Sequence, residues 1–199
     1  MKLNRAERWV VNNPSRVIQQ WMEIQWLKGR TPHARGGNFL EVGCGRGAGG
    51  RLILRHFQPD RLNLLDLDIR MIRQARRYLT PEEKSRAFFH VADATGLPFR
   101  SSSLDAVFGF GFLHHVPRWR RALEEIARVL VPGGIYYMEE LYPSLYQNRI
   151  TRRFLLHPED DRFRSEDLKG ALKAAGLELK AFKELKPAGI LGVGIRARK

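Results

Sequence analysis

Apolar and polar positions along the chain form blocks that predict strands and helices in turn. Short apolar runs, typical of buried strands, occur at residues 38–42, 62–66, 87–92, 104–110 and 135–141. Between these runs, apolar residues recur every three or four positions, as on one face of a helix, within residues 48–57, 69–79 and 119–130. Strands that alternate with helices predict an α/β fold, in which a parallel sheet is covered by helices on both faces.

Capping residues and glycines indicate how the chain is organised outside this core. Asn13 and Pro14 are suited to open a helix that Gly29 ends, and this helix precedes the first strand. The pattern predicts an N-terminal helical extension over residues 1–35 and a main domain over residues 36–199.

The second half of the chain departs once from the regular alternation. Residues 142–164 are aromatic, basic and irregular, which predicts a variable segment. Ser165 is the predicted N-cap of a helix that Gly176 ends. Residues 177–186 and 190–197 then alternate like a closing pair of strands.

Composition restricts the class of protein. With 199 residues and 43% hydrophobic content, the chain suffices for one ordinary domain with a real core. No apolar run approaches the roughly 18 residues of a membrane span, and residues 1–10 lack the apolar block of a secretory signal. The single cysteine excludes an internal disulfide and a zinc site made of cysteines, and no metal site is expected. The lack of disulfides favours a reducing cytoplasm as the compartment.

The net charge of +14 allows several kinds of partner. It arises from 35 Lys and Arg residues against 21 Asp and Glu residues. Nucleic acid, an anionic membrane surface and acidic small molecules are all compatible with it. Because the arginines are scattered and form no single tract, an ordinary solvated basic surface is favoured.

The first strand leads into a glycine loop that is typical of a nucleotide or cofactor site. Glycines let a ligand approach the backbone, and the amides of the following helix face outward. Gly45, Gly47 and Gly50 satisfy the dinucleotide pattern GxGxxG, so an NAD-type cofactor and another adenosine cofactor both remain open at this point.

Three acidic residues near the strand ends refine this choice. Glu41 stands just before the loop, where a carboxylate repels a pyrophosphate but suits an ammonium or sulfonium group. Asp66 ends the second strand, about 20 residues after the loop, where a carboxylate can accept both hydroxyls of a ribose. Asp93 and Ala94 follow the third strand. There the acid can accept a hydrogen bond from an adenine amino group, and the adjacent backbone N–H can donate to a ring nitrogen. Asp68 fits better as a helix N-cap.

The ordered set of motifs resembles the class I S-adenosylmethionine-dependent methyltransferases, and within them the small-molecule group that includes quinone-biosynthesis enzymes (methyltransferase type 11). The resemblance covers roughly residues 36–180. It implies a doubly wound, Rossmann-like sheet of seven strands, mostly parallel, with an antiparallel last strand. It also implies S-adenosylmethionine as cofactor and S-adenosylhomocysteine as product. The motifs that carry it are 41–47, Asp66, 93–94, 97–99, 104–107, 113–116 and 127–134.

The resemblance assigns cofactor contacts to particular residues. The glycines would lie against the cofactor, Glu41 would organise the loop, and Phe110 stands where many relatives carry a small polar residue facing the methionine part. Cys44 is expected to be only a small loop residue, since nothing provides it with a base. The predicted cofactor-binding residues are Glu41, Gly43, Cys44, Gly45, Gly47, Asp66, Leu67, Asp93, Ala94 and Phe110.

Catalysis requires mainly alignment of the acceptor and exclusion of water, with a general base only for an acceptor that holds its proton. The base candidates at strand ends are His114, His115, Glu139, Glu140 and Tyr142, among which His115 and Glu140 are preferred. The acceptor is expected to be a small apolar or anionic molecule, contacted by the N-terminal helix and residues 142–164. An RNA methyltransferase, which the basic charge favours but for which no RNA-binding module is present, and a non-catalytic cofactor-binding relative remain alternatives. The oligomeric state stays open.

Overall fold

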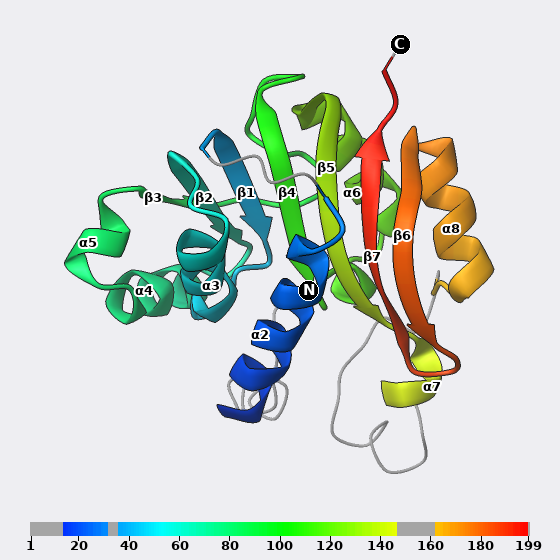
Figure 1. Cartoon of the computed structure of the whole chain (residues 1–199), viewed down its shortest axis with the longest axis horizontal. Helices are drawn as coiled ribbons and strands as arrows, with labels where there is room; N and C mark the ends of the chain where they lie inside the picture. The colour runs from blue at the N-terminus through cyan, green and yellow to red at the C-terminus, as the bar shows by residue number, and fades with distance from the viewer. Residues whose placement is uncertain (1–13, 32–35, 147–161, 199) are drawn as a thin grey trace.

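The computed structural model describes residues 14–31, 36–146 and 162–198, which form one seven-stranded sheet with helices on both faces (Figure 1). The strands are β1 (Asn38–Val42), β2 (Arg61–Asp66), β3 (Ala87–Val91), β4 (Leu104–Phe110), β5 (Leu130–Leu141), β6 (Leu177–Leu185) and β7 (Gly189–Arg196). The helices are α2 (Pro14–Lys28), α3 (Ala48–His56), α4 (Ile69–Tyr78), α5 (Pro81–Lys84), the 3-10 turn η1 (Leu113–His115), α6 (Trp119–Val129), α7 (Pro143–Tyr146) and α8 (Ser165–Ala174).

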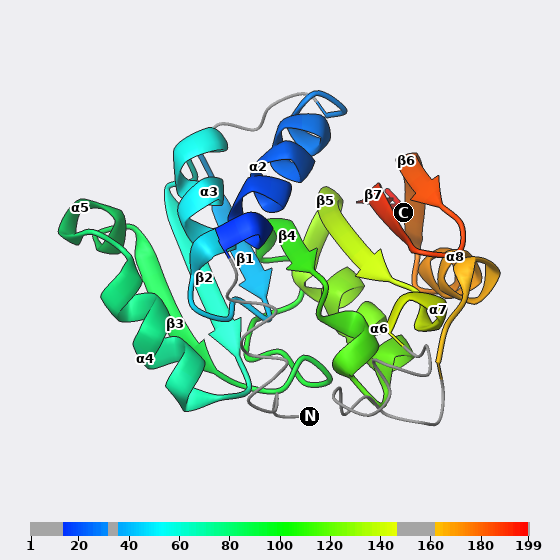
Figure 2. The same ribbon diagram turned by 90° about the horizontal axis from the view of Figure 1, so that it is seen from below.

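Strand order and direction confirm the expected sheet. The order is β3-β2-β1-β4-β5-β7-β6, with β1 parallel to β2 and β4, β2 parallel to β3, and β4 parallel to β5. β7 is antiparallel to both of its neighbours. Strands β1 to β6 therefore end at one side of the sheet, at the bottom of Figure 1 and facing the viewer in Figure 2. We call this side the carboxyl edge; its strands end at Val42, Asp66, Val91, Phe110, Leu141 and Leu185.

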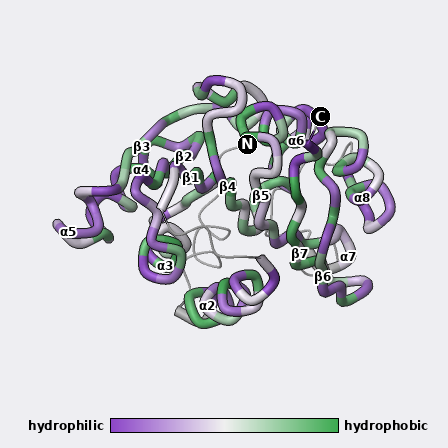
Figure 3. The backbone as a smooth tube through the Cα atoms, turned by 45° about the horizontal axis from the view of Figure 1, so that its top comes forward, coloured by the Kyte–Doolittle hydropathy of each residue, from purple (hydrophilic) through white to green (hydrophobic). Residues whose placement is uncertain are grey.

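The central strands β1, β2 and β4 are buried on both faces, which explains why they read as continuous apolar runs. On β4, Val107 faces the core formed with α6 and α8, whereas Phe108 faces the core formed with α2, α3 and α4. The Phe108 ring stacks on Tyr137 of β5 with centroids 4.6 Å apart. Ile24 and Leu27 join the second core, so α2 covers the sheet beside α3 (Figures 2 and 3).

Two predicted boundaries are wrong. β5 begins at Leu130 instead of residue 135, because Leu130 already pairs with Leu104 and a register shift accommodates the glycines that follow. The predicted N-cap Ser165 is instead the first residue of α8. Arg164 holds the cap position, and its backbone N–H donates to Asp167 Oδ2 over 2.9 Å.

Part of the predicted organisation lies outside the described residues. This applies to residues 1–13 and 32–35 of the predicted extension and to residues 147–161 of the predicted variable segment. Over the ranges that the structure does describe, no helix combines the length and the apolar character that crossing a membrane requires.

Candidate functional site

A cavity of about 340 Å³ opens at the carboxyl edge. Its walls come from the residues that follow β1, β2 and β3 and from the segment between β4 and α6. Seven of the twelve predicted site residues line it, and they are Gly43, Gly45, Asp66, Leu67, Asp93, Ala94 and His115. The other five, which are Glu41, Cys44, Gly47, Phe110 and Glu140, are not among the lining residues.

The glycine loop is folded back onto the end of β2. The backbone N–H groups of Gly43 and Cys44 both donate to Leu65 O, over 2.8 and 3.0 Å. Gly45 has φ +52°, and a Cβ there would meet no atom within 4 Å, since this residue faces the cavity. Gly47 has a different purpose, because a Cβ there would lie 3.0 Å from the Ala75 Cβ. Gly47 therefore permits close packing of the loop on α4, whereas Gly43 and Gly45 line the cavity.

Asp66 connects this loop to β2. Its Oδ2 accepts a hydrogen bond from the Gly45 N–H over 3.0 Å, and its Oδ1 accepts one from the Asp68 N–H over 2.9 Å. Burial raises the pKa of Asp66, and the amides of Asp68 and Gly45 oppose that shift. Asp68 is the N-cap of α4 as predicted, since it accepts from the Arg70 N–H. Each Asp66 oxygen retains acceptor capacity for a ligand hydroxyl on the cavity side.

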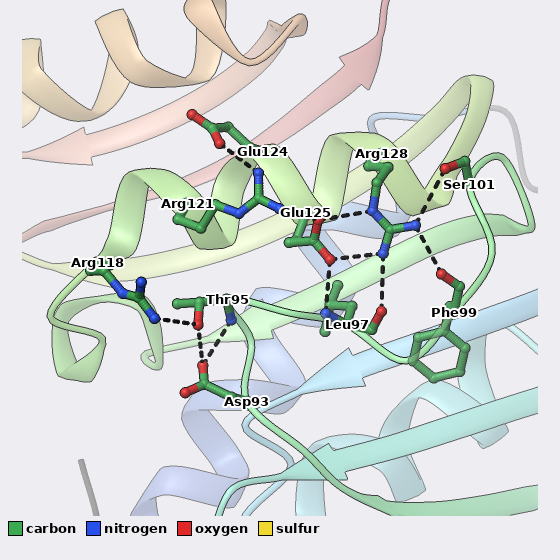
Figure 4. Close-up of polar contacts among 10 residues, drawn as sticks. All are labelled: Asp93, Thr95, Leu97, Phe99, Ser101, Arg118, Arg121, Glu124, Glu125 and Arg128. Carbon is green, nitrogen blue, oxygen red and sulfur yellow. Dashed lines mark hydrogen bonds and ion pairs between the residues drawn. The ribbon is translucent and has the colours of Figure 1, made fainter.

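Asp93 presents a second carboxylate at the next strand end (Figure 4). Its Oδ1 accepts hydrogen bonds from both the N–H and the Oγ1 of Thr95, each over 2.8 Å. The backbone bond from Thr95 is the main reason why the pKa of Asp93 lies below its ordinary value. Arg118 extends from the segment before α6 and reaches Thr95 Oγ1 at 3.5 Å. The carboxylate is thus fixed in its ionised form beside the cavity.

The loop after Asp93 is anchored by α6. The Leu97 N–H donates to Glu125 Oε2 over 2.8 Å, and Arg128 Nη2 donates to the Leu97 carbonyl oxygen over 3.0 Å (Figure 4). Arg128 also donates to Glu125, which lowers the pKa of that carboxyl. This network fixes the loop around Leu97, which follows the cavity residues 92–95, against α6.

Glu41 and Cys44 lie beneath the loop. Glu41 is 2% exposed, and burial together with the charge of Asp66 raises its pKa to about 8. Its carboxylate occupies the space that a Cβ on Gly49 would need and accepts from the Gly50 amide. Burial is also the main cause that raises the pKa of the Cys44 thiol. Glu41 organises the loop from behind, and Cys44 is a buried thiol with no thiolate character at neutral pH.

Phe112, which the sequence did not single out, takes the position expected of Phe110. Phe110 belongs to the core on the opposite face, where its ring centroid is 6.2 Å from that of Phe108. Phe112 lines the cavity, and its side chain lies against Gly43 and Gly109, where any Cβ would collide with it. A continued period-2 alternation would place Phe112 on the face of Phe110, whereas it packs in the opposite core after Gly111, whose φ is +64°. The local pattern therefore gave no signal for Phe112. Met71, Thr95 and Pro117 are further lining residues that the sequence did not single out.

Glu140 and His115 have different surroundings. The Glu140 side chain is fully buried and accepts hydrogen bonds from the backbone N–H of Leu113 over 2.9 Å and from the Phe112 and His114 amides over 3.3 and 3.4 Å. It also lies 2.9 Å from His114 Nδ1. His115 lines the cavity, with its ring centroid 4.3 Å from that of His114. Glu140 therefore holds the backbone of η1 through these hydrogen bonds. Of Glu140 and His115, only His115 lines the cavity.

A buried ion network joins α2 to the end of β5. Arg16 Nη2 donates to Glu139 Oε2 over 2.6 Å, and Nη1 donates to Glu23 Oε1 over 3.2 Å. Gln19 Nε2 also donates to Glu23 Oε1. Burial and the nearby charge of Glu139 raise the pKa of Glu23 to about 7. Both Arg16 and Glu139 come within 4 Å of the position of a Cβ on Gly111, so they lie directly beyond the end of β4.

Together these residues suit a ligand that carries a ribose and a base. The cavity is lined by Asp66 and Asp93 at neighbouring strand ends, by Gly43 and Gly45, and by His115 on the wall after β4. Within the described residues, no cluster of His, Cys, Asp and Glu side chains could hold a metal ion.

Comparison with known proteins shows similarity to methyltransferases. Residues 40–138 match the family model described as a methyltransferase domain. The chain is 37% identical over 108 residues to a fatty-acid O-methyltransferase of Mycolicibacterium smegmatis, which covers 54% of this chain and 38% of that protein. It is 30% identical over 166 residues to a phthiotriol/phenolphthiotriol dimycocerosates methyltransferase of Mycobacterium ulcerans, over 82% of this chain and 55% of that protein.

The fold has close counterparts among solved structures. A crystal structure of a SAM-dependent methyltransferase from Aquifex aeolicus superposes with a TM-score of 0.78 over 98% of this chain and 100% of that chain, at 15% identity. At this identity the match concerns the fold alone. The chain spans only 38% and 55% of the two curated relatives named above.

Proposed function

We propose that the chain is a class I S-adenosylmethionine-dependent methyltransferase that methylates a small, apolar, lipid-like acceptor. Two relatives support this substrate class, since their names assign a fatty acid to one and phthiotriol dimycocerosates to the other. We also propose that α2 and residues 142–164 contact the acceptor, as expected from the sequence.

The cavity residues fit S-adenosylmethionine. The position of a Cβ on Gly45 is open toward the cavity, and so the backbone there is accessible to the ligand. Asp66 would bind the ribose diol, Asp93 would accept from the adenine amino group, and the Ala94 amide would donate to the ring. Gly43 and Gly45 would carry the amino-acid end, with Leu67 against the nucleoside.

The bound cofactor supplies a methyl group that its positive sulfonium already activates. The protein residues have to align the acceptor and exclude water. Phe112 provides an apolar wall at the end of β4, and His115 stands on the same wall where it can take a proton from an acceptor hydroxyl or carboxyl. Glu140 supports His115 indirectly, through His114 and the η1 backbone.

One observation carries the proposal: the Asp66 carboxylate is held by the Gly45 N–H inside a cavity that Asp93 also lines. The test is transfer of labelled methyl groups from S-adenosylmethionine to a total lipid extract and, in parallel, to total RNA. Label in the organic phase is the expected result. Label in RNA alone would support the RNA methyltransferase that the +14 charge favours, and no label in any pool would support a non-catalytic relative.

His115→Ala tests the assignment of the base. Turnover should fall about 100-fold, while the affinity for S-adenosylhomocysteine changes little, since a general base acts only on the chemical step. His56→Ala is the matched control, because His56 stands at the far end of α3 next to Gln25 and outside the cavity. An unchanged kcat in His115→Ala would leave His115 with a purely structural role.

A further inference from the structure

The exposed apolar side chains of the described residues gather at the carboxyl edge. Nine large apolar side chains are exposed, and seven of them lie at this edge or within two helical turns of it. Those seven are Ile18, Trp21, Met22, Leu67, Ile69, Val91 and Leu185. Single exposed apolar residues are normal on any protein surface. Their concentration at one edge of the sheet is not, and it indicates a surface with a function.

The first group forms a stripe on α2. Trp21 and Met22 follow Ile18 by three and four positions, and the three side chains are 47%, 54% and 63% exposed in that order. Ile24 and Leu27, on the inner side of the helix, are fully buried. Figure 3 shows this recurrence of hydrophobic residues along α2. α2 is therefore apolar on two sides, and only one of them is used by the core.

The ion network fixes that stripe beside the site. Arg16 binds Glu139 near the end of β5, and Ile18 follows two positions later on the same helix turn. With a rise of about 1.5 Å per residue, Met22 lies within about 10 Å of Arg16 along the helix axis. The start of α2 is thus held near the end of β5, on the side of the edge that the proposed function gives to the acceptor.

The second group is divided between the cavity and the far end of the carboxyl edge. Leu67 lines the cavity and is 40% exposed, and Ile69 begins α4 directly after it with 43% exposure. Leu185, at the tip of the β6–β7 hairpin, is the most exposed of the nine at 73%. Figure 2, which looks onto the carboxyl edge, shows α2, α4 and this hairpin on different sides of the strand ends. Such an arrangement fits an extended apolar surface better than a single narrow groove.

Cations stand among these apolar residues. Arg70 follows Ile69, Arg118 lines the cavity, and Lys186 follows Leu185, and all three side chains are exposed. The whole chain carries a net charge of +14. Apolar residues that enter the acyl boundary, accompanied by Lys and Arg that contact anionic headgroups, are the two elements of interfacial membrane binding.

We propose that the carboxyl edge docks on an anionic lipid surface, with the α2 stripe, Leu67, Ile69 and Leu185 against the lipid and the cavity mouth facing it. The acceptor then passes from the lipid layer to the site without crossing water. This inference rests on the lipid-like acceptor of the proposed function, and it adds the place where that acceptor is collected.

The test is co-sedimentation of the full chain with vesicles of phosphatidylcholine alone and with vesicles of phosphatidylglycerol and phosphatidylcholine in equal parts. Binding is expected only with phosphatidylglycerol, and it should weaken with added salt. The double variant Ile18→Ser and Trp21→Ser should bind at least about tenfold more weakly, because its apolar contacts with the acyl region are lost. Phe88→Ser is the matched control, since Phe88 is also exposed but lies near the opposite end of β3.

Binding of S-adenosylhomocysteine, measured on the same samples without lipid, separates this inference from the proposed function. Intact binding of this ligand in all variants, together with vesicle binding that only the α2 variant loses, supports the docking surface. Absence of vesicle binding, equal loss in the Phe88→Ser control, or salt-sensitive binding to RNA in place of vesicles would each overturn it. Failure to bind S-adenosylhomocysteine would instead contradict the assignment of the cavity.

Discussion

The two halves of the carboxyl edge are built in different ways. On the cofactor half, at the ends of β1 to β3, carboxylates accept hydrogen bonds from nearby backbone amides, as Asp66 does from Gly45 and Asp93 does from Thr95. On the acceptor half, at the ends of β4 and β5, side chains hold one another across long stretches of sequence, as Arg16 and Glu139 do over 123 positions. We therefore expect cofactor binding to depend on local backbone shape, and acceptor placement to depend on packing between distant segments.

The largest effect is expected on the cofactor half from Gly45→Val. The φ of +52° strains any L residue, and the new side chain would project into the cavity. The affinity for S-adenosylhomocysteine, measured by calorimetry, should fall by at least about 100-fold. Gly96→Val provides the control, because it also has open space around its Cβ but has an ordinary φ and does not line the cavity. Equal losses in both variants would show that Gly45 has no special contact with the ligand.

A smaller loss is expected from Asp66→Asn. An amide cannot accept two backbone hydrogen bonds and a ribose diol as a carboxylate can, and loss of a charged acceptor should weaken S-adenosylhomocysteine binding by about 10- to 100-fold. Asp105→Asn is the comparison, since Asp105 also accepts from a backbone amide, that of Asn38, but lies at the start of β4. Normal binding by Asp66→Asn would remove the ribose contact from this account.

Arg16→Ala should affect the acceptor half alone. It leaves Glu139 and Glu23 without their shared cation, which should lower the free energy of unfolding by about 2 kcal/mol in a urea titration. The value of kcat should fall about tenfold, because the chemical step requires an aligned acceptor, while the Kd for S-adenosylhomocysteine stays within about twofold of the unaltered protein. Arg16→Lys should restore part of the turnover.

Arg55→Ala is the surface counterpart of this change. Arg55 pairs with Glu83, but its side chain is 55% exposed, so the loss in stability should stay within about 0.5 kcal/mol. If both arginine variants reduced turnover equally, the ion network beside β5 would have no particular role on the acceptor side.

The most modest effect concerns Glu41 and appears only as a function of pH. The pKa of Glu41 is about 8 in the folded protein and 4.5 ordinarily, so the folded state retains a proton that the unfolded state releases. Stability from this group is complete below pH 4.5 and is lost as the pH rises through 8. Glu41→Gln should therefore show a flatter decline of the urea midpoint over this range than the unaltered protein. Parallel curves for the two proteins would mean that Glu41 is ionised in the fold.

The same contrast explains what could be predicted from sequence. The strands β1 and β4, the helix start at Asp68 and most residues of the cofactor half follow from local patterns, because glycines, caps and strand-end acids act within a few positions. Phe112 and the Arg16–Glu139 pair could not be found this way. Their positions depend on how α2 and the segment after β4 pack on the sheet. For the same reason, the location of Glu140 at a strand end gave no sign that backbone amides donate to its carboxylate.

The central claim is that cofactor binding and acceptor placement are held by separate halves of the edge. It is tested most directly by measuring the Kd of S-adenosylhomocysteine for Asp66→Asn and Arg16→Ala side by side in one calorimetric experiment. The account predicts a clear loss of affinity in Asp66→Asn and an unchanged affinity in Arg16→Ala. Comparable losses in both variants, or a loss in Arg16→Ala alone, would contradict it.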